Sequence, residues 1–563
     1  MSLFSLIPPE TSGLNFMNNV QETYEKNYYK FVYIYNGGGV AVGDINNDGL
    51  ADIYFTGNEV PNKLFLNKGN LEFEDITDKA GVAGDNGWYT GVSMVDVNGD
   101  GLLDIYACKS DWLTNAPYQR RNQLFINRGD LTFEEKAEEY GLHDEGFSVQ
   151  ASFFDYDNDG DLDVYLTNHP YEYNLELEER LERRDNPEYS VRDRLYHNNN
   201  GKFEDVSLKA GINNYGHGLG VITADLNQDG YIDIYVSNDF KEPDYFYLNN
   251  GDGTFSNAVK EYFGHIPFYA MGVDAADINN DGLEDLFITE MLPKDYKRSK
   301  TNMAPMSVQL FDDMLALGLH HQYMHNMLQI NRGVNRFSEV SQMTGLSETD
   351  WSWACLLSDF DNDGLRDVFV TNGFKRDIFD KDYFDKAKAI AKQQGGNLDV
   401  FQLYELIPFT KLANFIFKNE GNLKFTDKSK VWGFDDLTLS QGAAVADFDN
   451  DGDLDLVINN LDEPSQIYRN NAEKLNNHYL KISLKGNPRN STGLGAKILI
   501  KYANQQQIFQ MKVTRGFQSS SEHIAHFGLG RHTQVDEIEV VWLDGKRTIQ
   551  TNVATNQLIH IKY

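Results

Sequence analysis

Asp44-Ile45-Asn46-Asn47-Asp48-Gly49-Leu50-Ala51-Asp52 is the stretch that decides the fold of this chain, because its nine-residue pattern recurs six more times. The other copies begin at Asp96, Asp155, Asp225, Asp277, Asp359 and Asp447. In every copy, positions 1, 3, 5 and 9 carry Asp or Asn, and a glycine follows position 5. Alternate side chains on such a tight loop can converge on one point, and the glycine permits the sharp turn.

Loops of this kind match the requirements of calcium. Ca²⁺ takes six to eight oxygen ligands at about 2.3–2.6 Å, whereas the stricter octahedron of Mg²⁺ tolerates such loops poorly. We therefore predict about seven structural Ca²⁺ sites, with side chains from positions 1, 3, 5 and 9 and the backbone carbonyl of position 7 as ligands. The predicted ligands are Asp44, Asn46, Asp48, Leu50, Asp52, Asp96, Asn98, Asp100, Leu102, Asp104, Asp155, Asp157, Asp159, Asp161, Asp163, Asp225, Asn227, Asp229, Tyr231, Asp233, Asp277, Asn279, Asp281, Leu283, Asp285, Asp359, Asp361, Asp363, Leu365, Asp367, Asp447, Asp449, Asp451, Asp453 and Asp455. The loops that begin at Asp155, Asp359 and Asp447 carry four carboxylates where the others carry three, and we expect them to hold calcium longest.

The segments beside the loops distinguish two kinds of calcium protein. An EF-hand loop lies between helices. Here each loop follows a run rich in Gly, Ala and Val, such as 38–43, and precedes a β-branched or aromatic run, such as 52–55. These compositions indicate strands on both sides. An ordinary Asp/Gly turn would explain one copy, but seven copies in phase disfavour it.

A longer phrase around each loop defines a repeat unit. It is clearest as Leu64-Phe65-Leu66-Asn67, an LFxN run, followed by an FxDxT run at 73–77 and by Ala80-Gly81. Four strands per unit, repeated seven times, predict an all-β fold, a seven-bladed β-propeller with calcium loops over residues 1–475. The last unit lacks its final strand, and we expect the N-terminal segment 10–16 to supply it and close the ring. A solenoid of the same units is the alternative.

Composition narrows the possible partners and compartments. The formal net charge of −35 argues against nucleic acid or an anionic membrane as a partner. No stretch reaches the roughly 18 apolar residues of a transmembrane segment. The two cysteines, Cys108 and Cys355, are expected to be buried thiols. Residues 1–3 look like a leader before a mature chain, and we expect that a native signal or lipid anchor has been removed.

The loops and the LFxN and FxDxT phrases resemble the FG-GAP/VCBS-repeat β-propellers with a C-terminal ASPIC/UnbV domain, a cartilage acidic protein-like family. The runs that resemble the ASPIC/UnbV domain are Gly493-Leu494-Gly495-Ala496-Lys497, Gly516-Phe517-Gln518-Ser519-Ser520-Ser521, His526-Phe527-Gly528-Leu529-Gly530 and Val541-Trp542-Leu543-Asp544-Gly545. The resemblance implies an extracytoplasmic calcium-binding protein, secreted, periplasmic or on the cell surface, without a settled activity. Independently, alternating strands at 479–484, 497–502, 537–542 and 558–562 predict a small β-sandwich or barrel over residues 478–563.

Three long connections predict where a ligand could bind. They span 169–192, 290–325 and 372–412 and would lie on the rim opposite the calcium loops. The catalytic candidates among them are His169, Glu290, Lys375, Arg376 and Asp377.

Three further features of these regions each have a structural and a functional interpretation. Residues 175–182 predict a short charged helix, for which a solvated surface role is favoured. His321 and His325, with His320 beside them, have the i, i+4 spacing of a helical metal pair but no evident third ligand, which disfavours a transition-metal site. Trp351 and Trp353 are expected on one side of a strand, where core packing is favoured over a sugar platform.

Two classes of function fit this sequence. The favoured class is a non-catalytic binding, adhesion or scaffold module for an unidentified glycan or protein. The alternative is a propeller-based polysaccharide lyase or hydrolase, which would need an acid/base pair on the insertion-rich face. No GxSxG, P-loop or dinucleotide fingerprint supports other enzyme classes.

Overall fold

The computed structural model describes residues 2–114, 116–173, 175–185, 191–302, 306–393 and 400–563. Its basic unit is a four-stranded antiparallel sheet in which the strands follow chain order. The first unit contains β2 (Val40–Gly43), β3 (Asp52–Phe55), β4 (Lys63–Asn67) and β5 (Phe73–Asp75). Its acidic loop joins β2 to β3, and the Asp at position 9 begins β3. The prediction that strands flank the loops is therefore confirmed.

The unit recurs through the propeller region, and the described residues contain seven such sheets. The second to sixth units are β6 (Tyr89–Val95), β7 (Asp104–Lys109), β8 (Gln123–Asn127) and β9 (Phe133–Glu135); β10 (Ser148–Phe154), β11 (Asp163–Asn168), β12 (Arg194–Asn198) and β13 (Phe203–Asp205); β14 (His217–Ala224), β15 (Asp233–Asp239), β16 (Tyr245–Asn249) and β17 (Phe255–Asn257); β19 (Val273–Ala276), β20 (Asp285–Ile288), β22 (Met327–Asn331) and β23 (Phe337–Glu339); and β24 (Ser352–Ser358), β25 (Asp367–Asn372), β26 (Phe415–Asn419) and β27 (Phe425–Asp427). The last unit contains β28 (Ser440–Ala446), β29 (Asp455–Asn460), β30 (Gln466–Asn470) and β1 (Phe4–Ile7).

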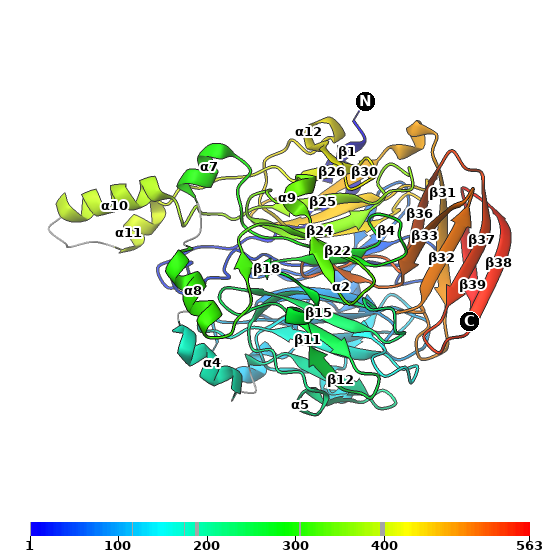
Figure 1. Cartoon of the computed structure of the whole chain (residues 1–563), viewed down its shortest axis with the longest axis horizontal. Coiled ribbons are helices and arrows are strands. Elements are labelled where there is room, and N and C mark those ends of the chain that lie inside the picture. The colour runs from blue at the N-terminus through cyan, green and yellow to red at the C-terminus, as the bar shows by residue number, and fades with distance from the viewer. Residues whose placement is uncertain (1, 115, 174, 186–190, 303–305, 394–399) are drawn as a thin grey trace.

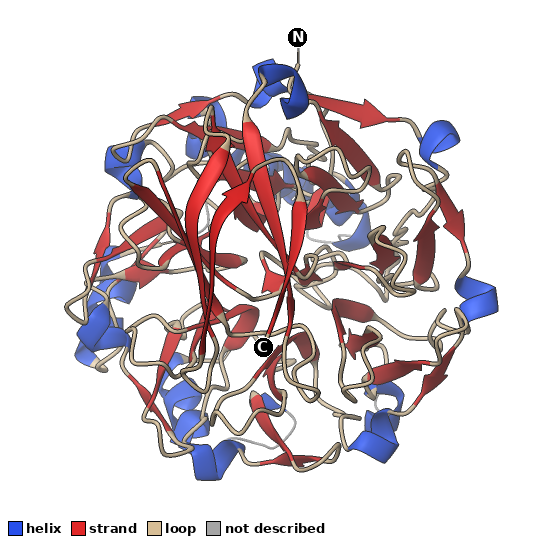
Figure 2. Cartoon of the chain, turned by 90° about the vertical axis from the view of Figure 1, so that its right-hand side faces the viewer, coloured by secondary structure: helices blue, strands red, loops and turns tan. Residues whose placement is uncertain are grey.

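The sheets are arranged around an axis as a β-propeller (Figure 2). Their innermost strands β2, β6, β10, β14, β19, β24 and β28 contact one another in chain order, and β28 contacts β2. The expected propeller fold is therefore confirmed, and the contacts form a closed ring rather than an open solenoid.

The end of each unit differs from the expected strand. In the first unit β5 ends at Asp75, and Thr77–Ala80 form a one-turn helix, α2, that ends at Gly81 with φ 73°. Equivalent short helices are α3 (Ala137–Tyr140), α5 (Ser207–Ala210), α6 (Val259–Tyr262), α9 (Ser341–Thr344) and α12 (Ser429–Trp432). All of these helices except α6 end at a left-handed glycine, a conformation that favours glycine, and in α2 and α5 this glycine follows an alanine.

A short helix of the same kind explains why the predicted closing strand at the N-terminus was wrong. Residues 10–16 were expected to form the closing strand, but Pro9–Ser12 form helix α1, followed by Gly13 with φ 76°. The strand that pairs with β30 is β1, just before this helix. Leu3 is also part of the fold, since it is buried and its carbonyl accepts a hydrogen bond from the Asn471 N–H.

The C-terminal domain and the long insertions lie at opposite ends of the propeller (Figure 1). The domain is a β-sandwich of two sheets, β36-β31-β39 and β33-β32-β37-β38. These strands are β31 (His478–Lys485), β32 (Lys497–Tyr502), β33 (Gln505–Gln510), β36 (Ile524–Gly530), β37 (Gln534–Val541), β38 (Arg547–Ala554) and β39 (Leu558–Lys562). The insertion end carries helices α4 (Leu177–Asp185), α7 (Tyr296–Thr301), α8 (Val308–Ala316), α10 (Lys381–Gln393) and α11 (Val400–Glu405), and α4 confirms the predicted charged helix.

A segment of the C-terminal domain fills the hub of the ring. It contains β34 (Thr514–Arg515) and β35 (Ser519–Ser520), and β35 pairs with β2. The hydroxyl oxygens of Ser519, Ser520 and Ser521 accept hydrogen bonds from backbone N–H groups of β2, β6 and β28, respectively. Phe517 packs on Trp353 with ring centroids 4.8 Å apart. We call residues 513–521 the hub segment.

Glycines immediately before the inner strands β2 and β19 make room for the hub segment. A Cβ atom on Gly39 would lie 1.7 Å from the Gln518 carbonyl oxygen, and one on Gly272 would lie 2.8 Å from the Gly516 carbonyl oxygen. From the insertion end, Phe31, Ile34 and Tyr35 are buried in the same apolar cluster as Phe517. The hub is therefore packed from both ends, and these packed side chains replace a solvent channel.

Cys108 and Cys355 are free and buried, as predicted, and burial raises the pKa of both thiols. In the described part of the chain, no helix is long and apolar enough to cross a membrane.

Candidate metal loops and ligand face

Backbone amides orient the carboxylates of the acidic loops. In the first loop, Asp44 Oδ2 accepts from the Gly49 N–H at 2.8 Å, and Asp44 Oδ1 accepts from the Asp48 N–H at 3.1 Å. Asp52 accepts from the Ile45 N–H at 3.0 Å and from the Asn67 N–H at 2.8 Å. The same bonds to positions 1 and 9 recur in the loops at Asp225, Asp277 and Asp359.

The loop carboxylates are buried close together, which makes their charges costly without a cation. Burial raises the pKa of Asp52 to about 8 and that of Asp104 to about 7. Burial and the neighbouring carboxylates, Asp163 first among them, raise the pKa of Asp155 to about 8. Each of these groups would remain ionised at neutral pH if a divalent cation lay beside it.

Distances and unpaired oxygens also fit calcium. Among the described residues, ligand oxygens of Asp359, Asp361 and Asp367 lie within 4.8 Å of one another, and so do those of Asp447, Asp449 and Asp455. Two oxygens bound to one Ca²⁺ at about 2.4 Å can be at most about 4.8 Å apart. Among the loop carboxylates that the structure describes, buried oxygens without a hydrogen-bond partner are Asp155 Oδ1, Asp361 Oδ1, Asp449 Oδ1 and Asp453 Oδ1. The donor set is therefore suited to a hard cation.

Sequence reasoning missed the role of position 4. Its amide side chain donates to the carbonyl of the loop glycine in the next unit, for example Asn47 Nδ2 to Gly101 O at 3.0 Å. The equivalent bonds join Asn158 to Gly230, Gln228 to Gly282, Asn280 to Gly364, Asn362 to Gly452 and Asn450 to Gly49. The last bond joins the seventh loop to the first. These bonds join adjacent loops directly.

The second loop does not make this hydrogen bond to the next loop. Position 4 of the second loop is Gly99, which has no side chain to donate, and a Cβ atom there would lie 2.2 Å from the Pro488 carbonyl oxygen. The C-terminal domain docks at this position, where Arg489 Nη1 also lies 2.8 Å from Asp161 Oδ1. The absence of a side chain at Gly99 therefore makes room for the docked domain.

The C-terminal domain contacts the first carboxylate of several loops. Lys481 Nζ lies 2.6 Å from Asp447 Oδ2, and Lys497 Nζ lies 2.7 Å from Asp225 Oδ2. In the second loop, the Ser491 hydroxyl donates to Asp96 at 2.5 Å. Docking of this domain and the geometry of the loops are therefore physically linked.

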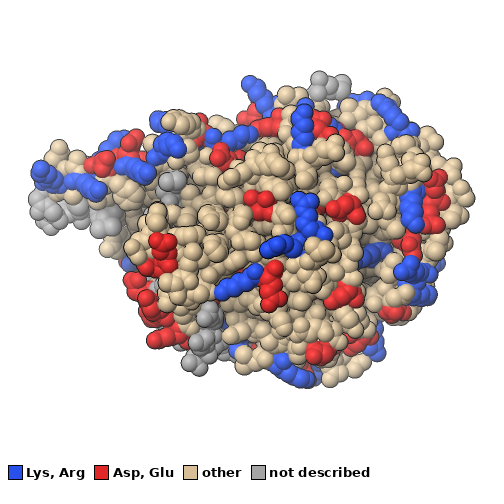
Figure 3. All heavy atoms as spheres, viewed as in Figure 1, with Lys and Arg blue, Asp and Glu red and all other residues tan. Residues whose placement is uncertain are grey.

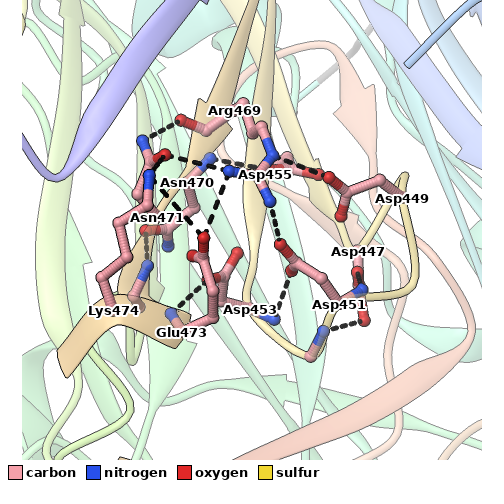
Figure 4. Close-up of polar contacts among 12 residues, drawn as sticks. Asp447, Asp449, Asp451, Asp453, Asp455, Arg469, Asn470, Asn471, Glu473 and Lys474 are labelled. Carbon is pink, nitrogen blue, oxygen red and sulfur yellow. Dashed lines mark hydrogen bonds and ion pairs between the residues drawn. The ribbon is translucent and has the colours of Figure 1, made fainter. Parts of the chain in front are cut away.

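In each of the three most acidic loops, the additional carboxylate at position 3 has a basic neighbour. Arg469 Nε lies 2.8 Å from Asp449 and Arg469 Nη2 lies 2.5 Å from Asp451 (Figure 4). Lys418 forms ion pairs with Asp361 and Asp363. These basic residues occupy the x position of LFxN, where the four less acidic loops have Leu66, Ile126, Leu248 and Ile330.

The third such neighbour is a histidine. His197 Nδ1 lies 3.4 Å from Asp163 and 3.6 Å from Asp157. The Asp163 carboxylate beside it raises the pKa of His197 to about 9. Position 3 is therefore Asp where the x residue is basic and Asn where the x residue is apolar.

The first two catalytic candidates are internal structural groups. Glu290 accepts from the Tyr269 N–H at 2.9 Å and the Met291 N–H at 2.5 Å, and burial raises its pKa well above the usual range. His169 is 2.9 Å from the Ser110 hydroxyl, and burial lowers its pKa to about 4.

The other three catalytic candidates anchor the third insertion. Arg376 makes a bidentate ion pair with Glu22 at 2.8 and 2.7 Å. Lys375 Nζ lies 2.6 Å from Asp462 and 3.6 Å from Glu22 Oε2. Asp377 accepts from the Arg298 guanidinium at 3.1 Å and from the Thr410 hydroxyl at 2.6 Å. The two basic residues thus meet at Glu22, while Asp377 belongs to a separate network.

The tryptophans pack as expected. Trp351 stacks on Phe374 with ring centroids 3.6 Å apart, and Trp353 Nε1 donates to the Gly373 carbonyl at 2.7 Å. A neighbouring cavity lined by Tyr33, Asp239 and other residues holds about 20 Å³, room for about one water. This cavity is too small for a sugar.

Exposed aromatic side chains lie on the segments of the insertion end. They are Tyr24, Tyr29, Tyr171, Tyr296, Tyr323, Phe384 and Phe409, with exposed fractions from 40% to 79%. In Figure 3, basic and acidic side chains are interspersed over the visible face, and several basic side chains lie on the projection formed by α10 and α11. We call the surface formed by these aromatic residues the insertion face.

Comparisons with known proteins describe both parts of the chain. The FG-GAP-like repeat pattern matches residues 44–107, 109–166, 188–236, 225–288 and 396–480, and the ASPIC and UnbV pattern matches residues 486–563. Cartilage acidic protein 1 of Mus musculus is 24% identical over 547 residues, which cover 92% of this chain and 72% of that protein. The Xenopus tropicalis protein of the same name is 24% identical over 533 residues, covering 90% and 70%. Among solved structures, an Agrocybe aegerita lectin described as recognising non-reducing terminal N-acetylglucosamine aligns over 71% of this chain and 82% of its own, with 15% identity and a TM-score of 0.36.

Proposed function

The chain belongs to the FG-GAP-like repeat family and carries a C-terminal ASPIC and UnbV domain, and from this premise we propose that it is a calcium-stabilised module for binding, adhesion or scaffolding outside the cytoplasm. Its ligand would be a glycan or a protein bound at the insertion face. About seven loops would hold Ca²⁺, each through the side chains of positions 1, 3, 5 and 9. Calcium here has a structural role, because it compensates buried carboxylates that otherwise repel one another.

One contrast supports binding over catalysis. The catalytic candidates are held by structural partners, and apart from Lys375 and Arg376, which share Glu22, they lie in separate networks, whereas the aromatic side chains of the insertion face are exposed. Aromatic and arginine side chains are enriched where proteins bind partners. A single exposed apolar side chain is normal on a protein surface, whereas several exposed rings at one end of the molecule are typical of a binding surface. The insertions thus offer a recognition surface on a rigid scaffold.

A glycan array combined with a lyase assay on acidic polysaccharides tests this proposal. We expect binding in millimolar calcium without new unsaturated ends. A triple variant, Tyr24→Ala, Phe384→Ala and Phe409→Ala, should weaken binding at least tenfold. Tyr563→Ala, which removes an aromatic ring that is 44% exposed on the C-terminal domain, is the matched control and should bind as wild type.

Two outcomes would contradict the proposal. New unsaturated ends or released sugar would favour a polysaccharide lyase or hydrolase. Equal loss of binding in the triple variant and in Tyr563→Ala would place the ligand away from the insertion face.

A further inference from the structure

We propose a second kind of metal site, for a transition metal, formed by His265, His325 and Glu339. The site lies between the fourth and fifth sheets of the propeller, away from the acidic loops. It uses two imidazoles and one carboxylate, a ligand set suited to Zn²⁺, Co²⁺ or Ni²⁺ rather than to Ca²⁺. This inference does not depend on the calcium loops.

Three separate segments bring the ligands together. His265 follows α6 and precedes β18 (Ile266–Pro267), His325 lies between β21 (Gln322–Tyr323) and β22, and Glu339 ends β23. The parallel pairing of β18 with β21 fixes the two histidine segments beside each other. The site is therefore set by the fold and not by a local sequence motif.

The distances fit a metal with short bonds. His265 Nε2 lies 3.6 Å from Glu339 Oε2, and one ligand atom from each of the three residues lies within 4.8 Å of the other two. Ligand atoms of a tetrahedral zinc site with bonds of about 2.0–2.1 Å are about 3.3–3.5 Å apart. The separation of His265 Nε2 from Glu339 Oε2 is close to this value, and the ligand atom of His325 lies within 4.8 Å of both.

Neighbouring groups hold two of the three ligands in place. His325 Nδ1 is 2.8 Å from the Asn326 carbonyl oxygen, so this nitrogen carries the proton and Nε2 is left as the basic nitrogen. Glu339 Oε1 accepts from the Ser341 N–H at 2.6 Å, while Oε2 faces His265. Support of this kind is typical of metal ligands, whose second polar atom is bound to the protein.

The site is accessible from solvent. The side chain of His265 is 31% exposed, whereas that of Glu339 is 8% exposed. A metal could enter past His265, and water could fill a fourth position, as in zinc sites with three protein ligands.

This arrangement replaces the pair suggested by the sequence. His321 and His325 have the i, i+4 spacing of a helical metal pair, although the sequence disfavoured a site there, and Gln322–Tyr323 form strand β21, so the two side chains do not share a helix face. His320 Nε2 is instead 3.0 Å from the Phe263 carbonyl oxygen, and His321 packs on Phe311. His321→Ala is therefore a matched control for His325→Ala.

Calorimetric titration with Zn²⁺ in excess calcium tests the site. We expect saturable binding in wild type that weakens at least tenfold in His265→Ala, in His325→Ala and in Glu339→Gln, and that persists in His321→Ala. Co²⁺ should give the intense visible absorption bands of a tetrahedral site in wild type and lose them in the same three variants. His197→Ala should retain binding, which excludes the acidic loop at Asp157 and Asp163 as the source of the signal.

The melting temperature of each variant in calcium, without transition metal, checks that its fold is intact. The proposal fails if wild type shows no saturable Zn²⁺ or Co²⁺ binding, or if folded His265→Ala and Glu339→Gln bind as tightly as wild type. His265→Ala is the safer variant should His325→Ala not fold, because His265 is half-exposed and His325 is buried.

Discussion

Single residues decide how much charge an acidic loop carries. The loops at Asp155, Asp359 and Asp447 were expected to hold calcium longest because they have one carboxylate more than the others. The ion pairs of His197, Lys418 and Arg469 offset that extra charge. The ranking remains a prediction, but a count of carboxylates alone no longer supports it.

Replacing one basic partner separates the effect of the ion pair from the effect of the number of carboxylates in the loop. Lys418→Leu should lower the free energy of unfolding in chelator by about 1–3 kcal/mol, because Asp361 loses the ammonium that it pairs with inside the protein. Calcium should restore most of the loss. The rise in melting temperature on adding calcium, measured by scanning calorimetry, should therefore be larger in the variant than in wild type.

Lys424→Leu is the control for this experiment, since Lys424 is exposed in the turn after β26. Equal calcium-dependent rises in the two variants would show that Lys418 does not compensate the loop.

A buried histidine gives the protein a dependence on acid pH. Burial lowers the pKa of His526 to about 4, and its Nε2 lies 3.2 Å from the Gly452 carbonyl oxygen. The unfolded chain, with a histidine pKa near 6.5, takes up the proton first as the pH falls. Stability is therefore lost as the pH falls from about 6.5 towards 4, by about 2 kcal/mol for this residue at pH 5.

The variant His526→Gln keeps a donor for Gly452 but does not titrate. Urea unfolding at pH 7 and pH 5 should show a loss of stability about 2 kcal/mol smaller in the variant than in wild type. Other titrating groups contribute equally to both proteins, so an identical pH dependence would exclude the role of His526.

At the scale of elements, the repeated strands were predictable and their ends were not. Alternating apolar residues and the fixed loop spacing located the strands beside each acidic loop. The one-turn helix at Thr77–Ala80 was missed, because four residues are too few to show helical periodicity. The predicted position of the closing strand was wrong for the same reason, because the one-turn helix Pro9–Ser12 was not recognised.

The hub segment is the element whose role could not be predicted. Gly516 to Ser521 were recognised as a run, but their place inside the ring depends on contacts with β2, β6, β19 and β28, which are distant in sequence. The proximity of His265, His325 and Glu339 could not be predicted for the same reason. The inward glycines, such as Gly39, were the available signal, since a crowded hub requires them.

Phe517 should contribute strongly to stability. Phe517→Ala would leave a cavity beside Trp353 at the centre of the ring and should lower the free energy of unfolding by about 3–5 kcal/mol. Ile549→Ala, on the exposed side of β38, should change it by less than about 0.5 kcal/mol. Urea denaturation measures both, and a small effect of Phe517→Ala would mean that the hub segment is not tightly packed.

At the scale of the whole molecule, the position 4 amides join the loops to one another, and the docked C-terminal domain contacts several of them. For sites with Kd near 10⁻⁴ M, millimolar calcium would add about 1.4 kcal/mol each, and about 10 kcal/mol for about seven sites without coupling. At about 2.1 cal/mol/K per residue, this corresponds to a shift of about 10 °C for the propeller.

Chelation with EGTA should therefore lower the melting temperature by about 10 °C, and restored calcium, but not magnesium, should reverse the loss. Asn450→Ala, which removes the amide between the seventh and first loops, should reduce the cooperativity of the calcium response. An unchanged melt in EGTA would refute the structural role of calcium.

The pairing of Phe4 with Asn470 also determines the order in which a newly made chain can finish folding. The first strand leaves the ribosome without its partner and waits until nearly the entire ring has been synthesised. The serines that complete the centre emerge later still. Until then the nascent polypeptide exposes an unpaired edge and an apolar interior, so its maturation depends on being shielded from aggregation up to the last stage of synthesis.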